Sequence, residues 1–126
     1  MSNPRFDHIH LRSPDPEAAA GFYVRHFGAT VTGRVQAGPR LRVMVSLAGV
    51  PLFIEEVPAE TAAPPAPPFL GLEHLGLAVD DLAAELDRLR AAGVEIISGP
   101  TIPRPGVTIA FLQAPDGVQV ELIERR

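Results

Sequence analysis

Histidine and glutamate residues recur in this 126-residue chain at one common spacing. His8 and Glu55 lie 47 residues apart, and His74 and Glu121 are separated by the same interval. Imidazole and carboxylate groups in this combination suit a divalent first-row metal ion, with further coordination positions open to substrate oxygens. The spacing therefore predicts a metal centre formed by two histidine–glutamate pairs, for which nickel, cobalt, zinc, manganese and iron all remain open.

These two pairs belong to an internal repeat with an offset of 66 residues, which aligns His8 with His74 and Glu55 with Glu121. In each half, a strand is followed by a helix and then by three further strands. The helices are expected to begin after Asp15 and Asp81 and to end at glycines. Strands are expected at 6–12, 29–34, 41–47, 52–57, 72–79, 94–97, 107–112 and 118–123.

Alternation along the predicted strands separates the candidate ligands from the core. His8, His10 and Arg12 share one face of the first strand, and its other face carries apolar residues. Glu121 likewise points away from its apolar neighbours on the last strand. We therefore expect the metal ligands to lie on the sheet face opposite the helix.

The order of elements predicts an α+β fold of two tandem βαβββ modules whose mixed sheets form a cup. Five prolines fall within residues 58–68, where they disfavour a helix or a central strand. This predicts one domain over residues 1–126, with module one at 5–57, a Pro-rich linker at 58–70 and module two at 71–124. Because neither half-length module encloses a site alone, we expect a homodimer.

Composition excludes several other kinds of chemistry. The chain has neither cysteine nor lysine, so thiol nucleophiles, thiolate metal sites and lysine Schiff bases are impossible. A net charge of −4 and scattered arginines argue against nucleic acid as a partner. No apolar run approaches the roughly 20 residues needed to cross a bilayer, so we expect a cytoplasmic protein without a membrane partner.

Four segments resemble the vicinal oxygen chelate superfamily, the family of glyoxalases, bleomycin resistance proteins and dioxygenases. They are D-H-I-H-L-R at 7–12, L-F-I-E-E at 52–56, E-H-L-G-L-A-V-D-D at 73–81 and A-P-D-G-V-Q-V-E-L-I-E at 114–124. The resemblance covers nearly the whole chain. It implies paired βαβββ modules around a divalent metal held by His8, Glu55, His74 and Glu121.

Within that superfamily, the pattern is most similar to the short bacterial glyoxalase I, because a carboxylate stands at position 55. This resemblance implies a lactoylglutathione lyase-like enzyme that stabilises an enediolate, with Glu121 as general base and Glu55 as its partner. The substrate would be the hemithioacetal of a 2-oxoaldehyde and a thiol cosubstrate. It also implies a homodimer whose sites are shared between subunits.

The sequence also fits other interpretations. His10 and Arg12 are candidates for the substrate pocket, but His10 could replace His8 as a ligand and Glu56 could replace Glu55. Ala59 lacks the polar side chain that short glyoxalases carry at this position. A methylmalonyl-CoA epimerase-like enzyme, a ring-cleaving dioxygenase and a non-catalytic drug- or metabolite-binding protein are the alternatives.

Overall fold

The computed structural model describes residues 2–126 and divides into two compact units, Met1–Ala62 and Ala63–Arg126. The boundary between them falls inside the predicted linker. Each unit has the same order of elements, namely a strand, a helix and three strands. The expected α+β class with two βαβββ modules is confirmed, and each module has its own four-stranded mixed sheet.

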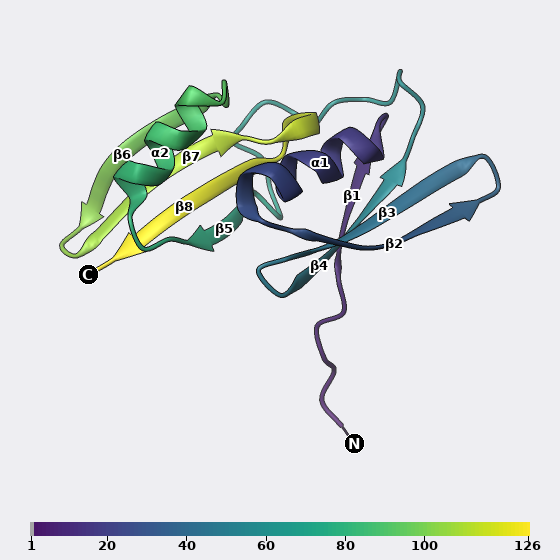
Figure 1. Cartoon of the computed structure of the whole chain (residues 1–126), viewed down its shortest axis with the longest axis horizontal. Coiled ribbons are helices and arrows are strands. Elements are labelled where there is room, and N and C mark those ends of the chain that lie inside the picture. Colours follow the sequence, from purple (N-terminus) through teal and green to yellow (C-terminus); the bar gives the residue numbers. More distant parts are fainter. Residues whose placement is uncertain (1) are drawn as a thin grey trace. The chain divides into compact units, whose positions relative to one another are not determined.

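The first module begins with β1 at Ile9–Ser13 and α1 at Pro16–Phe27. Three strands follow: β2 at Thr30–Ala37, β3 at Arg40–Leu47 and β4 at Val50–Glu56. Their order in the sheet is β1-β4-β3-β2, and only the β1–β4 pair is parallel (Figure 1). The first and last strands of the module are therefore neighbours.

The second module repeats this topology with β5 at Leu75–Ala78, α2 at Leu82–Ala91, β6 at Ile96–Arg104, β7 at Val107–Gln113 and β8 at Gln119–Arg125. The sheet order is β5-β8-β7-β6, and β5 runs parallel to β8. A short 3-10 turn, η1, at Pro115–Gly117 joins β7 to β8. Figure 1 shows α2 lying across one face of β6, β7 and β8.

Both helices begin at the aspartates that the sequence pattern indicated. The Asp15 carboxylate accepts a hydrogen bond from the Ala18 amide at 3.0 Å, and Asp81 accepts one from the Ala84 amide at 3.1 Å. These contacts satisfy amides that have no partner within the helix. Gly28 ends α1 in the left-handed conformation, with a φ of 67° that favours glycine. Within residues 2–126, neither helix is long and apolar enough to cross a membrane.

Each module has its own apolar core between its helix and one face of its sheet. In the first module, α1 packs mainly against β3 and β4, and Tyr23 on the helix is 1% exposed. In the second, Leu82, Leu86 and Leu89 of α2 are buried to a similar degree. Burying a leucine contributes about 1.5–3 kcal/mol, so each helix is held firmly against the apolar face of its sheet. The opposite face, which carries the candidate ligands, is therefore turned away from the helix. The buried apolar residues of the two sheets include Val43, Val45, Leu52, Ile54, Ala110, Leu112, Val120 and Leu122.

Several strands differ in length from the sequence-based expectation. β5 is limited to Leu75–Ala78 against the expected 72–79, and β1 and β6 differ as well. β1 begins at Ile9 rather than Phe6, since its pairing with β4 starts where Ile9 meets Leu52. β6 continues to Arg104 despite prolines at 100 and 103. It is an edge strand with three register shifts against β7, and an edge tolerates residues that cannot donate a ladder hydrogen bond.

Glu124 on β8 ties the end of the second module to the start of α2. Its side chain is almost fully buried and accepts a hydrogen bond from the Leu82 amide at 2.9 Å, and it also pairs with Arg126. The hydrogen bond from the Leu82 amide, followed by the contact with Arg126, lowers the pKa of this carboxyl group. An ionised Glu124 therefore stabilises the junction between β8 and α2.

We predict that Glu124→Gln lowers the free energy of unfolding at pH 7. Because the folded-state pKa of Glu124 is lowered, its contribution is fully present above the unfolded-state value of about 4.3 and is lost as the pH falls through the folded-state value. The difference from the unchanged protein should therefore shrink in acid, as measured by urea unfolding at pH 7, 5 and 3.5. Glu95→Gln, at an exposed position, is the control. A difference independent of pH would contradict this role.

Candidate metal centre

The first module holds one imidazole and one guanidinium against a single carboxylate oxygen. His10 and Arg12 lie on the same face of β1, and the parallel pairing places Glu55 of β4 directly opposite Arg12. Both His10 Nε2 and Arg12 Nε lie 3.1 Å from Glu55 Oε1. The β1–β4 pair therefore positions a compact group of polar side chains on the face away from α1.

The second module places a histidine and a carboxylate in a similar relation. His74 precedes β5, and its Nε2 lies 3.6 Å from Oε1 of Glu121 on β8. Glu121 stands opposite Gly76 in the parallel register. The Nδ1 atom of His74 contacts the Glu73 carboxylate. The predicted pair of His74 and Glu121 is thus brought together within one module.

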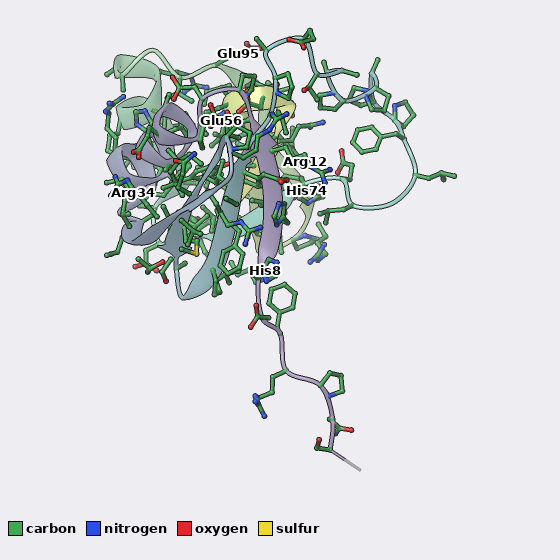
Figure 2. All side chains as sticks on the ribbon, turned by 90° about the vertical axis from the view of Figure 1, so that its right-hand side faces the viewer. His8, Arg12, Arg34, Glu56, His74 and Glu95 are labelled. Carbon is green, nitrogen blue, oxygen red and sulfur yellow. The ribbon has the colours of Figure 1, made fainter. Side chains whose placement is uncertain are left out.

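His8 has different neighbours from His10. Its ring stacks on Phe53 with centroids 4.0 Å apart, and its Nδ1 lies 2.6 Å from Asp7 Oδ2. Figure 2 shows His8 where the extended N-terminal segment enters β1, with Arg12 further along the strand. Among the residues that the structure describes, Glu55 is paired with His10 and Arg12 and not with His8. The structure therefore does not bring His8 and Glu55 into contact.

The donor atoms suit neighbouring ligands of one divalent ion. Metal–ligand bonds near 2.1 Å place two adjacent donors about 3.0–3.4 Å apart, close to the 3.1 Å and 3.6 Å separations found here. Histidine ligands commonly donate their second N–H group to a carboxylate, and Glu73 is placed to receive it from His74. Within residues 2–126, no cluster of three such donors occurs, so each module offers a pair.

Glu55 and its neighbour Glu56 have separate roles. Hydrogen bonds from His10 and then Arg12 lower the pKa of Glu55, so this carboxylate stays ionised to a lower pH than an ordinary glutamate. Glu56 instead accepts a hydrogen bond from the Leu41 amide at 2.9 Å. Of these two adjacent carboxylates, Glu55 is therefore the one held beside an imidazole.

Sequence reasoning overlooked the acidic residue that precedes each candidate histidine. Asp7 and Glu73 contact the Nδ1 atoms of His8 and His74. The signal was present, because Asp7-His8 and Glu73-His74 coincide at the 66-residue offset. The aromatic neighbours of these histidines, Phe53 and Phe111, have no such repeat in sequence, since they come from different strands of their modules.

Comparison with known families agrees with this architecture. Residues 5–122 match the family model described as the Glyoxalase/Bleomycin resistance protein/Dioxygenase superfamily. The chain therefore belongs to that superfamily. A solved structure of a glyoxalase family protein from Enterococcus faecalis has the same fold, with a TM-score of 0.80 at 24% identity over 95% of this chain and 97% of that one.

Two similar proteins match this chain over very different lengths. The chain is 41% identical to a probable chloroplastic lactoylglutathione lyase of Arabidopsis thaliana, but the match spans 44% of this chain and only 16% of the plant protein. It is 33% identical to an ethylmalonyl-CoA/methylmalonyl-CoA epimerase of Cereibacter sphaeroides over 94% of this chain and 96% of the relative. Both relatives are consistent with the superfamily.

We predict that Arg12→Ala raises the pKa of Glu55 toward its ordinary value, because one of the two groups that favour the ionised form is removed. The measurement is an NMR pH titration of the Glu55 carboxyl carbon in metal-free protein. Arg42→Ala is the matched control, since Arg42 also stands opposite Glu55 but its guanidinium lies over the Phe53 ring, 5.7 Å from the centroid. An equal rise in both variants would contradict the specific role of Arg12.

Proposed function

We propose that this protein is a metal-dependent lyase or isomerase of the glyoxalase type, acting on a small substrate with two neighbouring oxygens. The proposal rests on the two histidine–carboxylate pairs, one in each module, on sheet faces that point away from the helices. Similarity to the plant lactoylglutathione lyase supports it. A hemithioacetal of a 2-oxoaldehyde with a thiol cosubstrate is the substrate that we propose.

The proposed ligands are His74 and Glu121 from the second module and Glu55 with either His8 or His10 from the first. A divalent ion bound there would polarise the substrate carbonyl and offset negative charge that develops on oxygen. A four-ligand centre requires both pairs, taken from one chain or from two. We accordingly propose a homodimer. The molecular mass in solution and the number of metal ions bound per chain test this proposal.

The surroundings of the two glutamates suggest different tasks in proton transfer. Glu55 is held by both His10 and Arg12, which favour the ionised form and a fixed position. Glu121 has a looser contact with His74 and faces Gly76, which places no side chain beside it. We therefore assign the movement of a proton between adjacent substrate carbons to Glu121, with Glu55 as the fixed carboxylate.

Epimerisation of an acyl thioester is the second candidate, because the Cereibacter epimerase is similar along nearly its entire length. This reaction also removes a proton beside a carbonyl group and returns it, so the same side chains would serve. The first experiment therefore offers the metal-loaded protein methylglyoxal with glutathione and, separately, one epimer of methylmalonyl-CoA. Turnover of the first alone supports the lyase, and turnover of the second alone overturns it in favour of the epimerase.

We predict that Glu121→Gln lowers kcat by about 10²- to 10⁴-fold, the range expected when a positioned general base is removed. Metal content is measured on the same sample, so that loss of the ion is distinguished from loss of the base. Glu95→Gln, an exposed carboxylate of the second module, should leave kcat unchanged. Full activity of metal-replete Glu121→Gln protein would show that another group moves the proton.

A further inference from the structure

Strand pairing in the first module sets two arginines on either side of one glutamate. Arg12 of β1 and Arg42 of β3 both stand opposite Glu55 of β4, which lies between these two strands. Val35 of the edge strand β2 stands opposite Arg42 and completes the row. Because paired residues of neighbouring strands project on the same face, all four side chains belong to the face away from α1.

The two arginines of this row have different partners. Arg12 Nε lies 3.1 Å from Glu55 Oε1, an oxygen that His10 Nε2 also approaches. The guanidinium of Arg42 lies instead over the Phe53 ring, 5.7 Å from its centroid. Within residues 2–126, Arg42 forms no ion pair with a carboxylate, and its side chain is half-buried. The N–H groups of Arg42 are therefore available to a ligand.

The surface beside Arg42 is aromatic and apolar. Phe53 of β4 and Met44 of β3 form the next cross-strand pair on the same face, and the His8 ring stacks on Phe53 with centroids 4.0 Å apart. A guanidinium that lies over an aromatic ring is held by its flat face, so its N–H edge stays free to bind a planar anion. Phe53 therefore positions Arg42 without using its hydrogen-bond donors.

The second module has no cation at the corresponding position. Phe111 of β7 stands opposite Glu121 of β8, just as Arg42 stands opposite Glu55. The position facing the glutamate is therefore aromatic in one module and cationic in the other. Since the same type of sheet forms with phenylalanine there, the sheet itself does not require an arginine at position 42.

We propose that Arg42 is a specificity-determining residue that binds a carboxylate on the part of the substrate that does not react. This inference rests on the proposed function and narrows its substrate class to oxygenated substrates that carry such a carboxylate. A guanidinium matches a carboxylate with two parallel N–H···O hydrogen bonds. Glu55, which stands opposite Arg42, disfavours a phosphate dianion, because the repulsion between like charges grows with the charge of the ligand.

Binding is tested first without turnover, on the full-length, metal-free protein. The ligands are S-methyl-N-acetylcysteine, which has a carboxylate, and its neutral amide, titrated at constant ionic strength. NMR follows the Nε–H group of Arg42 and the ring protons of Phe53. The carboxylate should shift both sets of signals to saturation, and the amide should shift neither.

Two variants, each verified as folded by its amide spectrum, complete the binding test. Arg42→Gln removes the charge and should abolish the shift of Phe53, whereas Arg90→Gln, on the exposed surface of α2, should retain it. Equal shifts by the acid and the amide, or a shift of Phe53 retained in Arg42→Gln, would overturn the proposal. Tighter binding of inorganic phosphate than of the acid would overturn the choice of a carboxylate.

Turnover then tests the consequence for the proposed reaction. The metal-loaded protein receives the hemithioacetal of methylglyoxal with N-acetylcysteine or with N-acetylcysteine amide. The unchanged protein should prefer the acid in kcat/KM by about 5- to 20-fold, between the effects of an exposed ion pair and of a charge-assisted hydrogen bond. This preference should disappear in Arg42→Gln and persist in Arg90→Gln.

The two measurements separate the carboxylate site from the reaction. Equal kcat/KM values for the acid and the amide in the unchanged protein, or a preference retained in Arg42→Gln, would overturn the role of Arg42 in specificity. Turnover of neither hemithioacetal, together with carboxylate binding that depends on Arg42, would instead overturn the proposed lyase reaction and leave the carboxylate site in place.

Discussion

Parallel pairing between the first and last strands of each module is the constraint on which the candidate site depends. The strands β1 and β4, and likewise β5 and β8, are distant in sequence but adjacent in their sheets. A parallel pair requires a long crossover, which here consists of the helix and the two intervening strands. Once the pair forms, residues at the same level project on the same face, so a histidine near one strand start and a glutamate on the other become neighbours.

The helix positions and the two faces of each strand were predictable from sequence because each has a strong local signal. Aspartates at the helix starts and alternation around Ile54 and Val120 are such signals, and burial confirms the alternation. The relative register of β1 and β4 was not predictable. Side chains alternate with a period of two, so a displacement of two residues leaves every side chain on its original face. Alternation therefore cannot distinguish His8 from His10.

The sequence repeat and the pairing of the parallel strands consequently align different residues of the two modules. The 66-residue offset describes the helix caps and the glutamates well, because Asp15 and Asp81 occupy the same position in their modules. The offset fails for the pairing of β1 with β4. It aligns His10 with Gly76, but Gly76 stands opposite Glu121 whereas Arg12 stands opposite Glu55. Membership of the superfamily defines the fold but leaves the reaction open, since one fold supports several chemistries. The side chains beside the two glutamates are therefore the more informative feature.

The side chains beside the two glutamates differ in their charge. Beside Glu55 stands the cationic Arg12, whereas Gly76 and Ala78 on β5 add no charge beside Glu121. When both histidines are neutral, the first pair and its arginine carry no net charge, whereas the second pair and Glu73, which contacts His74, carry two negative charges. Because a neighbouring positive charge weakens the attraction of a carboxylate for a cation, the two modules present a cation with unequal attraction. Modules similar in fold and donor type are thus electrostatically unlike.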